Sequence, residues 1–178
     1  MYSKNLTRVL LSGLLATVFA STANAGKGHG DSAETGEAGK ASDVSRTITV
    51  EMYDNYYTPE SLQVKEGETV KFIIHNKGAL VHEFNIATAE MHVAHQPEML
   101  MMVQHGVLKG DRIDRKAAEA MQASMGHGMH KEANSALLEP GKSGEIIWKF
   151  PKHAKLQFAC NVPGHYDAGM YGDIKLTH

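Results

Sequence analysis

The sequence has 178 residues, of which 42% are hydrophobic and 21% are charged, and its formal net charge is −2 at pH 7. This length and composition fit one globular domain with appended segments. Lys and Arg are scattered without a run, so the sequence indicates neither a nucleic acid nor an anionic membrane as a partner. Cys160 is the single cysteine of the sequence and has no partner for a disulfide within it.

The N-terminal segment has the pattern of a secretory signal. Two basic residues precede an apolar run at residues 9–20, and the small-residue motif Ala23-Asn24-Ala25 follows the run. The run is well short of the ~20 residues that span a bilayer. We therefore expect a signal peptide at residues 1–25, cleavage near Ala25, and a periplasmic mature protein without a membrane anchor.

Residues 26–45 are dominated by Gly, Ala, Ser, Glu and Lys and show no apolar period. Such a composition predicts a flexible lead-in, because it buries too little apolar surface to order the chain. A single domain is expected over residues 46–178.

The domain shows the period-two alternation of half-buried strands on both sides of a segment at residues 88–139. Turn signals separate about seven such strands, which is typical of a Greek-key β-sandwich. The fold is therefore predicted to be all-β, with residues 88–139 as a helical or mobile insertion. The alternating positions are Ile48, Val50 and Met52; Leu62 and Val64; Val70, Phe72 and Ile74; Ile146, Trp148 and Phe150; Leu156, Phe158 and Cys160; and Ile174 and Leu176.

Strand parity directs two chemically active side chains into this sandwich. His82 shares a face with Phe84 and Ile86, and Cys160 shares a face with Phe158. An imidazole that faces a core costs free energy unless it is paired, and a metal ion is one way to pair it.

The segment from Cys160 to Met170 reads C-x4-H-x4-M, with His165 at its centre. Glycines bend the segment, so the thiolate, imidazole and thioether can converge on one point, and His82 can supply a second nitrogen. Two histidines, one cysteine and a weak axial methionine form the ligand combination of a blue-copper electron-transfer site.

Two other kinds of site fit the same residues less well. Structural zinc sites rarely recruit a thioether, and no second cysteine is available for a cysteine-rich site. A Cys–His nucleophile pair needs an orienting Asn or Asp, and no separate catalytic motif supplies one.

These residues resemble the plastocyanin and azurin superfamily of cupredoxins, and the likeness covers most of residues 46–178. Within the superfamily they look most like the periplasmic cupredoxins linked to bacterial copper tolerance, the CopI-like group. The likeness rests on Tyr57-Thr58-Pro59, on the strand at 69–76, on Val81-His82-Glu83-Phe84, on the strand at 141–150, and on the segment 160–170.

The resemblance implies that His82, Cys160, His165 and Met170 are the ligands of one type 1 copper that cycles between Cu(I) and Cu(II). It also implies that electrons pass through the edge of His165. Many cupredoxins have Asn after the first histidine, whereas this chain has Glu83.

The insertion is rich in methionine and histidine. Seven of the ten methionines and five histidines lie between residues 91 and 130. We expect the methionines from Met99 to Met102, including Met101, to pack a helix onto the sandwich. Glycines disfavour a packed helix in the motif at 125–130, so its thioethers and imidazoles are predicted to form a second copper site. That site comprises Met125, His127, Met129 and His130.

The sequence thus predicts a periplasmic type 1 copper protein with one-electron redox activity that serves copper tolerance or copper handling. Its expected partners are a redox protein or a copper donor or acceptor in the periplasm. The alternative is a dedicated electron carrier between periplasmic redox partners. A copper enzyme is not expected, because such enzymes need further copper centres, often built from His-x-His pairs, and this sequence contains no such pair.

Overall fold

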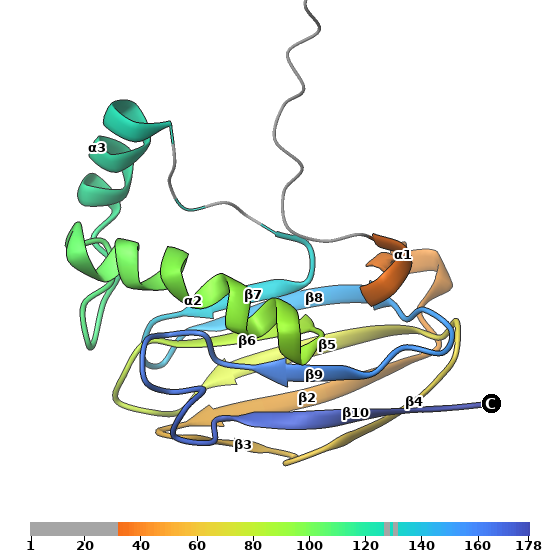
Figure 1. Cartoon of the computed structure of the whole chain (residues 1–178). Coiled ribbons are helices and arrows are strands. Elements are labelled where there is room, and N and C mark those ends of the chain that lie inside the picture. Colours follow the sequence, from red (N-terminus) through yellow and green to blue (C-terminus); the bar gives the residue numbers. More distant parts are fainter. Residues whose placement is uncertain (1–31, 127–128, 130–131) are drawn as a thin grey trace, which may run out of the picture.

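The computed structural model describes residues 32–126, 129 and 132–178. In this part of the chain, two β-sheets pack against each other and helices lie along one side and at one end (Figure 1). The strands are β1 (Glu37–Ala38), β2 (Arg46–Tyr53), β3 (Tyr56–Thr58), β4 (Leu62–Lys65), β5 (Thr69–Asn76), β6 (His82–Ala87), β7 (Ser135–Leu138), β8 (Ser143–Lys149), β9 (Leu156–Ala159) and β10 (Tyr171–Thr177). The helices are α1 (Ser32–Thr35), the 3-10 helix η1 (Ala41–Asp43), α2 (Ala89–Gln104) and α3 (Arg115–Met125).

Each sheet has five strands. The first sheet has the order β1-β8-β5-β2-β3 and the second has the order β4-β10-β9-β6-β7. Two pairs, β2 with β5 and β4 with β10, are parallel, and the other pairs are antiparallel. The predicted β-sandwich is therefore confirmed. The strands β1 and β3 were not expected, because two or three residues are too few to show an alternating pattern.

The core between the sheets follows from the alternation seen in the sequence. Phe72 and Ile74 from β5 and Phe84 and Ile86 from β6 are fully buried. They belong to one cluster with the side chains of the other inward-facing positions. Each such side chain contributes about 1.5–3 kcal/mol to the free energy of folding. This rigid core fixes the ends of β6 and β9, where the predicted ligands lie.

The segment before the domain is more ordered than its composition predicts. Residues 32–45 include α1, β1 and η1, and β1 pairs with β8 through Ala38 and Trp148. The Trp148 indole N–H donates to the Thr35 carbonyl at 2.9 Å. The prediction of a flexible lead-in over residues 26–45 is thus wrong for residues 32–45, because hydrogen bonds of residues 35–39 to β8 and of Ser45 to Thr69 order a segment that has no apolar period.

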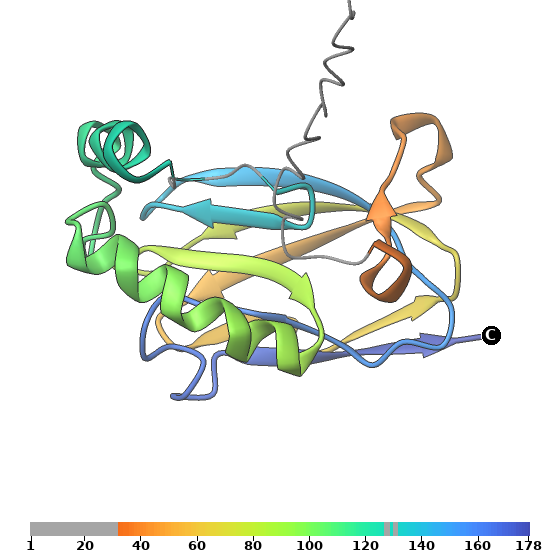
Figure 2. The same cartoon turned by 45° about the horizontal axis from the view of Figure 1, so that its top comes forward.

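The insertion contains the two long helices. The helix α2 lies alongside β6 and β9, and α3 lies beyond the end of the sandwich (Figure 1 and Figure 2). Thr88 caps α2, and the helix continues through Pro97 instead of ending there. The last part of the predicted insertion belongs to the sandwich, since β7 pairs with β6. Within the described ranges, the helices lack the length and hydrophobicity needed to cross a membrane.

A second apolar cluster attaches the helices to the sandwich. Met99 and Met102 are 1% and 6% exposed and pack with Met121 of α3. Val81, the residue before β6, belongs to the same cluster. The expectation that the methionines from Met99 to Met102 are packing residues is confirmed, since the partly buried Met101 packs against the same cluster.

Candidate metal centre

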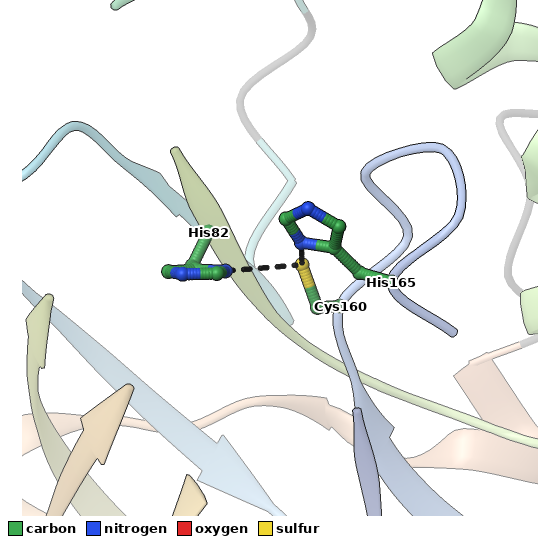
Figure 3. Close-up of side chains that lie close together, drawn as sticks. All are labelled: His82, Cys160 and His165. Atoms are coloured by element: carbon green, nitrogen blue, oxygen red, sulfur yellow. Dashed lines mark hydrogen bonds between the residues drawn. The ribbon is translucent and has the colours of Figure 1, made fainter. Parts of the chain in front are cut away.

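Paired strands bring the predicted ligands together. His82 is the first residue of β6 and Cys160 directly follows β9, and these strands are hydrogen-bonded neighbours. The Cys160 Sγ atom lies 3.3 Å from His165 Nδ1 and 3.8 Å from His82 Nδ1 (Figure 3). The three ligand atoms all lie within 4.8 Å of one another. His82 and Cys160 are both 0% exposed, and His165 is partly exposed.

The segment after Cys160 folds back as its spacing predicts. Main-chain bonds join Met170 N to His165 O at 2.9 Å and Cys160 N to Met170 O at 3.1 Å. Gly164 and Gly169 have φ angles of 87° and 93°, which glycine adopts without a steric penalty. Met170 is fully buried in the same core cluster as Cys160. All four predicted ligands therefore lie at one end of the sandwich.

The protonation of the three donors follows from their burial. Burial raises the pKa of the Cys160 thiol to about 12, although the Glu83 main-chain N–H donates to its sulfur. Burial also lowers the pKa values of His82 and His165, so both imidazoles are neutral at neutral pH. A neutral imidazole offers a nitrogen lone pair to a metal ion, and the ion must displace the thiol proton.

The orientation of His82 is set from outside the centre. Its Nε2 lies 2.8 Å from the Asp54 carboxylate, so Nε2 carries the hydrogen and donates it. The Nδ1 lone pair then faces Cys160. The hydrogen bond to His82 is the main reason that the pKa of Asp54 is lowered.

This donor set fits copper. It offers two neutral imidazole nitrogens, one thiol that becomes a thiolate on binding, and a buried thioether nearby. Thiolate and thioether are soft ligands that suit Cu(I), whereas structural zinc sites take four Cys or His ligands.

A family model described as a Cupredoxin-like domain matches residues 11–104, which is just over half of the chain. The chain belongs to the cupredoxin family. The family binds copper, and this donor set fits copper as its cofactor.

Curated relatives match this cupredoxin over nearly its whole length. The copper-resistant cuproprotein CopI of Pseudomonas aeruginosa is 43% identical over 173 residues, which cover 92% of each chain. The protein of the same name from Rubrivivax gelatinosus is 34% identical, with 94% of this chain and 96% of the relative covered.

Solved structures support the fold. Auracyanin B has a TM-score of 0.53 at 17% identity, with 82% of this chain and 95% of its own covered. The auracyanin of Roseiflexus castenholzii has a TM-score of 0.51 at 21% identity, with coverages of 76% and 99%.

Glu83 takes a role that sequence reasoning left unassigned. Glu83 is 4% exposed, and its carboxylate accepts hydrogen bonds from Asn161 Nδ2 at 2.8 Å, from Asn161 N at 3.3 Å and from Ser135 Oγ at 2.6 Å. Glu83 follows the predicted ligand His82 and Asn161 follows the predicted ligand Cys160, so this pair joins the two strand ends of the candidate centre. On the other side, the Asn161 side-chain oxygen contacts Nδ1 of the buried His92 at 3.2 Å.

The predicted second copper site is only partly within the described residues. Met125 ends α3 and is 43% exposed, and Met129 is 37% exposed. His127 and His130 lie outside the described residues. Gly126, with a φ angle of 69°, caps α3 and stops the helix before the motif, as the glycines predict.

Proposed function

We propose that this cupredoxin is a copper-tolerance protein that holds one type 1 copper through His82, Cys160, His165 and Met170. The observation that carries the proposal is the buried convergence of Cys160 Sγ with the two histidine Nδ1 atoms. The names of the relatives, copper-resistant cuproproteins, support tolerance as the biological role.

The residues of the chain prepare this centre for rapid one-electron exchange. Bound copper supplies the Cu(II)/Cu(I) couple. His82 and Cys160 sit at the ends of paired strands, and the main-chain bonds of the 160–170 segment hold His165 and Met170. Because a packed core holds the ligands, their positions are expected to change little between Cu(II) and Cu(I). The same packing keeps water away from the buried ligands. His165 is the partly exposed member of the set, so its ring is the expected path for electrons.

A host strain that lacks this protein gives the direct test of the role. Complementation with the unchanged gene is expected to restore growth at elevated copper, and Cys160→Ser is expected to fail at equal protein levels. Full copper tolerance of the strain that carries Cys160→Ser would show that the type 1 centre is not needed for the biological role.

A dedicated electron carrier is the alternative, and the Met/His motif distinguishes the two. Removal of residues 88–139 is too coarse a test, because it also removes β7 and the helix packing. Replacement of Met125, His127, Met129 and His130 by Ser leaves these elements in place. If the protein serves copper tolerance, this variant is expected to protect the host less well than the unchanged protein or to bind less copper per chain. If the protein is a dedicated electron carrier, neither the protection of the host nor the copper bound per chain is expected to change.

We further infer export to the periplasm and a non-catalytic role with a redox protein or a copper donor or acceptor as partner. The signal pattern at residues 1–25 supports export. Cell fractionation and N-terminal sequencing test it, with a mature N-terminus expected near Gly26. A full-length chain in the cytoplasm would overturn it.

A further inference from the structure

A carboxylate at the surface contacts the more buried of the two histidines. Asp54 lies between β2 and β3, and its side chain is 42% exposed. It accepts the His82 Nε2 hydrogen at 2.8 Å and the main-chain N–H groups of Ala79 and Leu80 at 3.0 Å and 3.3 Å. One carboxylate thus holds both the ligand ring and the loop that precedes it.

Gly78 in the loop before His82 allows the close contact between Asp54 and His82. A Cβ atom at Gly78 would lie 2.8 Å from His82 Nε2 and would also clash with Asp54 Oδ1. Only glycine therefore lets the main chain approach the Asp54–His82 pair this closely. Asn76 fixes the loop from the other side, because its side chain accepts from Gly78 N at 2.9 Å and donates to Leu80 O at 2.8 Å.

We propose that Asp54 is a positioning residue that favours Cu(II) over Cu(I) through the His82 ring, an inference that rests on the proposed type 1 centre. A carboxylate that accepts the distal N–H of a ligand histidine fixes its tautomer and makes the ring a stronger electron donor. The added negative charge stabilises the ion of higher charge. His82 is 0% exposed, so this effect is transmitted through a ring that water does not screen.

A merely structural role predicts a different outcome. If Asp54 only anchored the loop, any side chain that accepts the Ala79 and Leu80 N–H groups would serve equally well. Asparagine has almost the same shape and offers a carbonyl oxygen, but it carries no charge. Asp54→Asn therefore separates the electronic effect from the anchoring effect.

The experiment is voltammetry of the copper-loaded full chain. Loss of an outer partner of a ligand histidine typically costs about 10–100-fold in metal affinity. We expect Asp54→Asn to lower the ratio of Cu(II) to Cu(I) affinity about tenfold, which is about 59 mV of increase in the reduction potential. Asp111→Asn is the control, because it removes an exposed carboxylate that pairs with Arg112 instead. Equal potentials for Asp54→Asn and the unchanged protein would overturn the proposal.

A second variant tests the same contact without touching the carboxylate. Gly78→Ala is expected to push Asp54 away from His82 and to raise the reduction potential, as Asp54→Asn does. The double variant with both substitutions is expected to have nearly the same reduction potential as Asp54→Asn alone. Gly110→Ala is the matched control, because its Cβ meets only Leu80 Cδ2 at 3.8 Å. Equal potentials for Gly78→Ala and Gly110→Ala would contradict the proposal.

Nitrogen-15 NMR of the unchanged, Cu(I)-loaded protein gives a readout that needs no variant. The proposal requires a hydrogen on His82 Nε2 that exchanges slowly with solvent, and a hydrogen on Nδ1 would overturn it. The absorption spectrum distinguishes the two levels of inference. Without a thiolate-to-copper band in the unchanged protein the proposed function fails, whereas an intact band with an unshifted potential in Asp54→Asn contradicts only the role of Asp54.

Discussion

The Asn161 side-chain amide donates to the Glu83 carboxylate at 2.8 Å and thereby joins the residues that follow the predicted ligands Cys160 and His82. In this chain a carboxylate follows the histidine and an amide follows the cysteine. The pair lies beneath the centre in a region that is almost inaccessible to solvent. We therefore expect the Glu83–Asn161 pair to stabilise the metal-free protein.

Glu83→Ala is expected to destabilise the metal-free protein by about 1–3 kcal/mol, because it leaves the buried donors of Asn161 and the partly buried hydroxyl of Ser135 without their acceptor. Urea unfolding followed by circular dichroism measures the change. Glu145→Ala removes a carboxylate that is 58% exposed and pairs with Lys71, so a loss below about 1 kcal/mol is expected. Equal losses for the two variants would show that the buried Glu83 contacts contribute no more than an exposed ion pair.

The Cys160 thiol of the metal-free protein is expected to resist alkylation at neutral pH. Its pKa is raised from 9.0 to about 12 by burial, so the thiol stays protonated and the thiolate fraction at pH 7 is about a thousandfold lower than in an exposed cysteine. The rate of reaction with iodoacetamide in the folded and the urea-unfolded protein measures this. Similar rates in both states would contradict it. Copper uptake is expected to release the thiol proton, which a weakly buffered titration detects.

Met170→Leu tests the thioether without a large change in packing. The substitution nearly conserves volume, so the free energy of unfolding is expected to change by less than about 1.5 kcal/mol. The absorption spectrum and the reduction potential are expected to change, because the axial ligand tunes a type 1 centre. Met52→Leu is the control, since Met52 is equally buried in the same core and is no predicted ligand. Identical spectra for both variants would remove Met170 from the ligand set.

The buried methionines of α2 are expected to act through packing alone. Met99→Ala should cost about 2–5 kcal/mol of stability and leave the number of bound copper ions unchanged. Met125→Ala, at a position that is 43% exposed, should change stability by less than about 0.5 kcal/mol. Calorimetry and copper analysis of both variants provide the measurements. Loss of a copper ion from Met99→Ala would assign the helix a role in metal binding.

The sequence predicts the sandwich and the ligand cluster because both depend on local patterns. The alternation around Phe72 and Phe84 fixes the inward faces of the strands, and the same parity directs His82 and Cys160 toward the centre. The return of the 160–170 segment follows from its glycines and its short span. Local spacing is enough to describe these features.

Other features depend on residues that are distant in sequence. Asp54 reaches His82 across 28 positions, and Asn161 reaches Glu83 across 78. No local pattern marks Asp54 as different from an ordinary turn residue. Residues 35–39 are ordered by β8, more than 100 positions away, and their own composition gives no sign of this.

Absorption and paramagnetic-resonance spectroscopy of the copper-loaded protein, with copper quantified per chain, tests the central claim most directly. We predict an intense thiolate-to-copper band and a type 1 resonance in the unchanged protein, and the loss of both in Cys160→Ser. Survival of the band in Cys160→Ser, or copper bound to the unchanged protein without the band, would contradict the account.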